Sequence, residues 1–103
     1  MDKYKEYSDN LNIWYFLPEE IDIKTRKLYE KMPGWMGFDK NGIPYWFGFD
    51  GDEVSISPSV EPSGLLFFAT MEKNQWCNWL TNFKELATKE LGFPVGEPEE
   101  GFE

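Results

Sequence analysis

The sequence predicts an α+β domain, with an antiparallel sheet of four to five strands, a helix near the N-terminus and a long C-terminal helix packed on the sheet. Three observations lead to this fold class. Short apolar runs separated by turn-forming residues fill the middle of the chain, and one helical pattern precedes them and another follows them. The 103 residues are expected to form one domain, residues 1–103, with a small core. Aromatic residues make up 18% of the chain, and most of these bulky rings are expected in that core.

The N-terminal third is expected to hold one helix. Residues 1–10 are polar and are expected to form a helical turn or a loose start. The apolar run "NIWYFL", residues 12–17, is typical of a strand or a buried extended segment. Residues 18–32 are predicted to be helical, because Pro18 suits a first turn, acids follow it and bases gather toward the other end. Pro33 and Gly34 then end the helix.

A strand meander is predicted next. Its first three strands cover residues 35–39, 43–49 and 53–57, joined by the turns "KNG" and "DGD". These turns are expected to place Asn41, Gly42 and Gly51 at positive backbone dihedrals. The segment 58–64, which contains two prolines, is expected to be a loop. The run "LLFFA", residues 65–69, is apolar on both faces and is predicted to be a central strand.

The last helix has the clearest pattern. Apolar residues recur at helical spacing from Trp76 to Leu91. Thr70 is predicted to cap its start, and Gly92 to end it in the left-handed conformation. The tail from about residue 94 is acidic and contains several glycines and prolines, so it is expected to be exposed and mobile.

The charge favours a basic partner. The formal net charge is −9, and residues 51–103 carry ten acidic and three basic residues. This charge repels the phosphate backbone, so nucleic-acid binding is not expected. It attracts basic proteins and speeds their encounter. The alternative is that the acidity only keeps the protein in solution.

The sequence contains no pattern typical of catalysis or of metal binding. The chain has no histidine, the commonest general base and zinc ligand. The two Asp/Gly turns resemble pieces of a calcium loop, but the sixth residues counted from Asp39 and Asp50 are Pro44 and Ser55 rather than glycine. Cys77 has no histidine to activate it and is expected to be a buried or half-buried core thiol. Glycine-rich phosphate-binding motifs are absent. We therefore expect no enzymatic activity, no metal and no cofactor.

The expected compartment is the cytoplasm. The N-terminal residues have no apolar core of the kind that a signal peptide needs, and no apolar stretch is long enough to cross a membrane. The single cysteine excludes an internal disulfide.

A partner-binding surface is predicted around the aromatic strand 43–49. Alternation places Tyr45, Phe47 and Phe49 on one face of this strand and Trp46 on the other. If the helices cover the first face, Trp46 becomes an exposed anchor with an acidic rim, a combination typical of binding hot spots. The predicted surface residues are Trp35, Asp39, Trp46, Asp50, Asp52 and Glu53. The alternative is that both faces are covered, one by each helix.

The C-terminal segment "WCNWLTNFKELATKELGFPVGEPEEGF", residues 76–102, resembles the immunity proteins of bacterial toxin–immunity systems, as do the size and acidity of the chain. The resemblance implies a mechanism. The cognate toxin of such a protein is often a basic nuclease, and an acidic surface would occlude its substrate cleft. The implied partner is therefore a basic protein, bound by a monomer of this chain.

Two other functions stay open. One is a small-ligand module whose aromatic pocket lies between the sheet and the last helix. Its lining would be Trp76, Trp79, Phe67 and Phe83. The other is a structural or accessory subunit that associates through a sheet edge.

Overall fold

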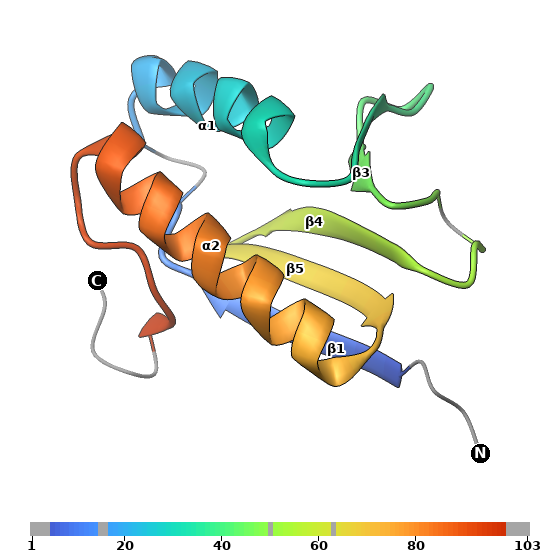
Figure 1. Ribbon diagram of the computed structural model, residues 1–103. Helices are drawn as coiled ribbons and strands as arrows, with labels where there is room; N and C mark the ends of the chain where they lie inside the picture. The colour runs from blue at the N-terminus through green and yellow to red at the C-terminus, as the bar shows by residue number, and fades with distance from the viewer. Residues whose placement is uncertain (1–4, 15–16, 50, 63, 99–103) are drawn as a thin grey trace.

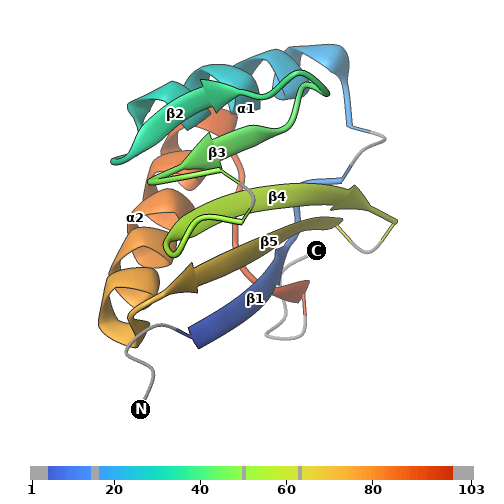
Figure 2. The same cartoon turned by 90° about the vertical axis from the view of Figure 1, so that its right-hand side faces the viewer.

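The computed structural model describes residues 5–14, 17–49, 51–62 and 64–98, and it confirms the predicted fold class. Five antiparallel strands form one sheet in the order β1-β5-β4-β3-β2. Both helices lie on the same face of this sheet, and no described helix covers the opposite face, which is called the uncovered face below (Figures 1 and 2). The elements along the chain are β1 (Lys5–Leu11), α1 (Glu19–Lys31), β2 (Trp35–Phe38), β3 (Pro44–Trp46), β4 (Ser55–Glu61), β5 (Gly64–Met71) and α2 (Lys73–Leu91).

The fifth strand is not the one the sequence predicted. β1 forms from the polar residues 5–11 and pairs in regular register with β5, from Lys5 opposite Met71 to Leu11 opposite Leu65. The predicted helical turn or loose start is therefore wrong for residues 5–10, and Asn12 and Ile13 follow the strand rather than begin one. Residues 15 and 16 of the predicted strand lie outside the described residues. β1 is an edge strand, which tolerates polar side chains on both faces.

The two helices match their predicted positions. Acids occupy the first turn of α1, where the helix dipole favours them. The N-cap of α2 is Glu72, whose carboxylate accepts hydrogen bonds from the backbone of Asn74 and Gln75. Thr70 is not the cap, because it still belongs to β5. Gly92 ends α2 in the left-handed conformation, as predicted. Among the described helices, neither α1 nor α2 has the length and apolar character that a membrane span requires.

The middle strands differ from the prediction in length. β3 stops after Trp46 because Phe47 takes a positive φ of 67°, which breaks the strand alternation. Its ring packs against Gly34, where an added Cβ would lie 2.7 Å from ring carbons. β4 continues through the predicted loop as far as Glu61. Among the described residues, β4 pairs with β3 only between Ile56 and Trp46. Pro58, which has no backbone N–H to donate, therefore disrupts no extended hydrogen-bond ladder between β4 and β3.

The two predicted turns differ from expectation at one residue. Gly42 and Gly51 have the expected positive φ, whereas Asn41 does not.

The core lies between the helices and one face of the sheet. Trp46 is at its centre, with ring centroids 5.2 Å from Tyr29 of α1 and 5.0 Å from Trp79 of α2. Phe67 packs on Phe83 at 4.9 Å. The indole nitrogen of Trp46 donates a hydrogen bond to the buried carbonyl of Tyr29, so this large ring is both packed and hydrogen-bonded.

The C-terminal segment is attached to the end of β1. The buried side chain of Asn12 donates to the carbonyl of Pro94 at 2.9 Å and accepts from the backbone of Gly96 at 2.9 Å. Lys84 forms an ion pair with Glu97. Val95 and Gly96 are buried, so the expectation that the tail is exposed from residue 94 does not hold for these two residues. Residues 99–103 lie outside the described part of the chain.

Candidate functional site

The uncovered face of the sheet is the candidate functional site. Successive side chains of β5 alternate between the two faces, and the difference is clearest at two neighbouring phenylalanines. Phe67 points toward the helices and is 0% exposed, whereas Phe68 points away from them and is 47% exposed. A large apolar ring therefore stands in solvent on a strand that is flanked by neighbours on both sides.

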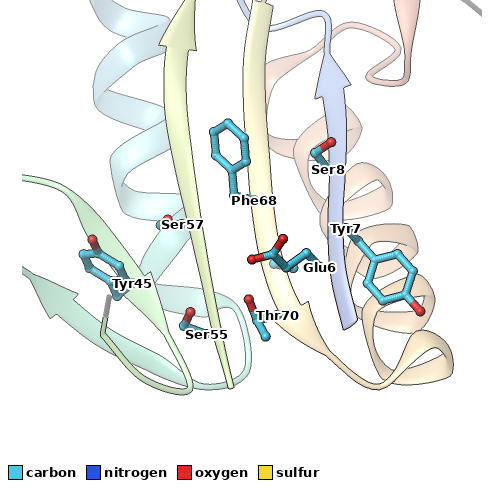
Figure 3. A pocket seen from close by; sticks show the side chains of 9 residues that line it. Glu6, Tyr7, Ser8, Tyr45, Ser55, Ser57, Phe68 and Thr70 are labelled. Carbon is cyan, nitrogen blue, oxygen red and sulfur yellow. The ribbon is translucent and has the colours of Figure 1, made fainter. Parts of the chain in front are cut away.

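Small polar side chains surround this ring. The residues opposite Phe68 on the adjacent strands are Ser8 of β1 and Ser57 of β4. The next row on the same face consists of Thr70, flanked by Glu6 and Ser55. Because the serine and threonine side chains are short, they leave a depression of about 520 Å³ in the sheet (Figure 3).

Tyr45 of β3 forms one wall of the depression. It lies on the β3 side of Ser55 and Ser57 (Figure 3), and only 7% of its surface is exposed. Phe49 covers part of it, with a centroid distance of 5.3 Å. The wall is therefore a fixed aromatic surface rather than a free ring.

One charge enters the depression. Of the described residues that line it, Glu6 is the one with a charged side chain, and its carboxylate points over Thr70 toward the centre (Figure 3). It forms no ion pair within the described part of the protein. The depression thus offers a carboxylate without an ion pair among the described residues, an aromatic ring and several hydroxyl groups.

This set of groups suits the binding of a cation. Hydroxyls and a carboxylate can accept hydrogen bonds from a cationic donor, and an aromatic ring attracts a cation through its face.

The predicted surface residues are not gathered in this depression. Trp46 was expected to be an exposed anchor, and this expectation is wrong, because Trp46 faces the helices and is 0% exposed. Its ring is not accessible to a partner in this structure. Trp35 is half-buried and packs on Trp46 and Phe38 at the β2 edge. The alternative with one helix on each face is also wrong, since both helices lie on one side.

The predicted acidic rim belongs to two turns. Asp39 accepts hydrogen bonds from the backbone of Asn41 and Ile43 in the β2–β3 turn. Asp52 accepts one from Phe49 in the β3–β4 connection. These carboxylates stabilise their own turns, while Glu53 is exposed. Asp50 lies outside the described residues. A role of these acids in partner binding stays a prediction.

Two further observations concern reactive or metal-binding groups. Within the described residues, no three Asp, Glu, His or Cys side chains come together as a metal site. Cys77 is exposed, so the expectation of a buried or half-buried core thiol is wrong. It falls on the solvent side of α2, between the buried Trp76 and the exposed Asn78.

The rings proposed for a ligand pocket beside α2 pack directly on one another. Trp79 lies 5.9 Å from Trp76, 5.6 Å from Phe83 and 5.6 Å from Phe67, measured between ring centroids. All four rings are buried, which favours a core role for them. An apolar depression of about 330 Å³ lies instead beside α1. Its lining includes Ile13, Leu17, Ile21 and Val60, which is 65% exposed.

Sequence reasoning missed the residues of the uncovered face. The signal that could have found them is the alternation "FFAT", in which Phe68 and Thr70 fall on one side of β5, together with the serines at positions 55, 57 and 59.

The sequence matches no family model, and no curated protein or solved structure matches it at a significant level. The resemblance to immunity proteins therefore stays a prediction.

Proposed function

We propose that this protein is a non-enzymatic binding protein whose uncovered sheet face docks on a basic protein. We further propose that the partner is a toxin, neutralised as an immunity protein would neutralise it. The observation that carries the docking proposal is Phe68, which is 47% exposed and lines a depression that Glu6 enters. Exposed aromatic anchors with polar surroundings dominate the energetics of many protein interfaces.

The distribution of charge supports a basic partner. The two helices contain seven basic and six acidic residues, so they are close to neutral. The whole chain has ten basic and nineteen acidic residues, which leaves three basic and thirteen acidic residues outside the helices. The excess negative charge therefore belongs to the strands, the turns and the terminal segments. Such a field accelerates the approach of a cationic surface.

Neutralisation would follow from occlusion. If the partner is a nuclease, its substrate cleft is basic because it binds phosphates. An acidic protein seated on that cleft competes with the nucleic acid without chemistry of its own. Affinity would come from Phe68 and its surroundings, while the carboxylates would set the rate and orientation of the encounter.

Co-expression with neighbouring genes tests the toxin proposal. Each reading frame next to this gene is expressed in a heterologous host, with and without this protein. We expect one product to arrest growth, and we expect this protein to relieve the arrest. If no neighbouring product is toxic, or if this protein gives no relief, the toxin proposal is wrong.

The salt dependence of the purified pair tests the electrostatic part. We expect the association rate to fall steeply between about 50 and 500 mM salt, while the dissociation rate changes little. An association rate that does not respond to salt would contradict steering by the acidic charge.

A second candidate function is a small-ligand module. The apolar depression beside α1 favours it, because Val60 is 65% exposed there and aliphatic side chains surround it. A fluorescent apolar probe should then bind in a saturable manner, and Val60→Asp should abolish that binding. Probe binding that is absent, or unchanged in Val60→Asp, would exclude this candidate.

A further inference from the structure

We infer that the depression on the uncovered face receives an arginine side chain of the basic partner, with its guanidinium between Phe68 and Glu6. This inference rests on the proposed docking function and names the chemistry of the group bound. It follows from three features of the depression: an accessible ring, a carboxylate at a suitable spacing and acceptor groups between them.

The ring is accessible because its neighbours are small. In an antiparallel sheet, directly opposed side chains have Cβ atoms about 4.5–5.5 Å apart, so a large neighbour would cover Phe68. Both opposed residues are serines, Ser8 and Ser57. The ring therefore presents a surface on which a planar group can stack.

The carboxylate lies one row further along the sheet. Glu6 is opposite Thr70, two residues from Phe68 on β5. Diagonal neighbours of this kind are about 7–8 Å apart, and the Glu6 side chain spans part of that gap by leaning toward the depression (Figure 3). A cation placed on the ring therefore comes within hydrogen-bonding reach of the carboxylate.

The charge of Glu6 is available for a partner. Three acids elsewhere in the protein form ion pairs within the chain: Asp22 with Arg26, Glu90 with Lys31, and Glu97 with Lys84. Glu6 has no such ion pair in the described part of the chain, and no described basic residue lines the depression. A cationic group of the partner would supply a positive charge for the Glu6 carboxylate.

Arginine fits these groups better than lysine does. A guanidinium is planar, stacks on an aromatic face and donates five hydrogen bonds, two of which match a carboxylate. The hydroxyls of Ser55, Ser57 and Thr70 can accept the others. An ammonium is a more strongly hydrated point charge that cannot stack, so it would use the ring less well.

A capped Gly-Arg-Gly peptide tests the recognition without knowledge of the partner. Amide resonances of the labelled full chain are followed by NMR during titration with this peptide, with Gly-Lys-Gly and with the neutral Gly-citrulline-Gly. We expect saturable shifts around Phe68, Glu6 and Ser57, with a Kd of about 10 mM for arginine, weaker binding of lysine and none of citrulline. Shifts that spread over the turn acids, or equal shifts with arginine and lysine, would overturn the inference.

Matched variants locate the binding. Phe68→Ala and Glu6→Gln should each abolish the saturable shifts. Their controls are Ile23→Ala and Glu30→Gln, which make the same kinds of change at exposed residues of α1. Phe68→Leu keeps an apolar side chain but removes the ring, so it should lose most of the binding without loss of folding. Equal binding by the wild type and by Phe68→Leu would contradict the stacking.

The partner found by co-expression separates this inference from the proposed function. We expect Phe68→Ala to weaken that complex about 30-fold, the loss typical of a hot-spot residue. A partner that binds Glu6→Gln as tightly as the wild type but binds Phe68→Ala more weakly would leave docking through Phe68 intact and overturn the arginine receptor. Unchanged binding by both variants would contradict docking through this face as well. If the peptide titration succeeds but no neighbouring product is toxic, the receptor stands and the toxin proposal is wrong.

Discussion

The two faces of strand β5 place the same residue type in opposite environments. Phe67 and Phe68 are adjacent in the sequence, yet Phe67 is fully buried under α2 and Phe68 stands among serines on the uncovered side. On the first face, rings pack on rings and stabilise the fold. On the second face, a ring of equal size has small polar neighbours, so it contributes little to the core and is available for a partner.

The same contrast occurs on β3. Trp46 lies under both helices and donates a hydrogen bond to Tyr29, whereas Tyr45 turns to the uncovered face and forms the wall of the depression. Neighbouring residues with opposite orientation thus belong to the core and to the proposed recognition surface, respectively. Substitutions made on each face separately test this division.

The largest difference is expected between the two phenylalanines. Phe67→Ala should destabilise the protein by about 3–5 kcal/mol, because it leaves a cavity between β5 and α2. Phe68→Ala should cost less than about 1 kcal/mol, because nearly half of this ring is already in water. Urea unfolding followed by circular dichroism measures both. Equal losses would mean that the uncovered face is part of the stabilising core.

The next effect concerns the hydrogen bond of Trp46. Trp46→Phe should cost about 2–3 kcal/mol, since it removes the indole donor to Tyr29 and part of a buried ring. Trp35→Phe makes the same change at a half-buried ring and should cost less than half as much. Chemical unfolding of the two variants gives the comparison, and a larger loss at Trp35 would place the centre of the core at the β2 edge instead.

A smaller effect is expected where the C-terminal segment closes the covered side. Asn12→Ala should cost about 2 kcal/mol, because the buried amide of Gly96 and the carbonyl of Pro94 lose their side-chain partner. The control is Asn78→Ala at an exposed residue of α2, which should change stability by less than about 0.5 kcal/mol. Hydrogen exchange at Gly96 should accelerate in Asn12→Ala, and unchanged protection there would contradict the role of this side chain.

The smallest effect on stability is expected from the ion pair between Lys31 of α1 and Glu90 of α2. Lys31 donates a hydrogen bond to Glu90 and holds the pKa of this carboxyl below its ordinary value of 4.5. The ionised form is therefore favoured in the folded state, so this contribution to stability is present above about pH 4.5 and is lost as the pH falls through the lowered pKa. In Glu90→Gln, the decrease of Tm on acidification should be shallower than in Glu85→Gln. A steeper decrease would contradict the pairing.

Much of the fold could be predicted because local patterns agree with it. The apolar stripe from Trp76 to Leu91 and the glycine after it define α2, and the acids after Pro18 define the start of α1. β1 was missed because five of its seven residues are polar, and its inward face combines Tyr7 and Leu11 with Lys5 and Asp9. Its inward residue Asp9 is stabilised by the indole of Trp76, a contact between residues far apart in the sequence.

The candidate site could not be predicted for a different reason. Alternation correctly separated Tyr45 from Trp46, but the sequence does not state which face the helices cover. Both helices pack on the face of the sheet that carries Trp46, so the residue predicted as an exposed anchor lies in the core. Phe47 added a second error, because its positive φ removes it from the alternation on which the prediction depended.

The pairing of β1 with β5 constrains the order in which the chain can fold. β1 leaves the ribosome first, yet its hydrogen-bonding partner lies some sixty residues later, from Gly64 to Met71. Until β5 has been synthesised, β1 lacks the strand with which it pairs. The backbone hydrogen bond from Asn12 to Gly96 can form only later still. Contacts of such long sequence separation slow folding, because the loop between them must close first. The nascent chain would therefore hold β1 as an unpaired strand until β5 has emerged, and the sheet can be completed only after that point.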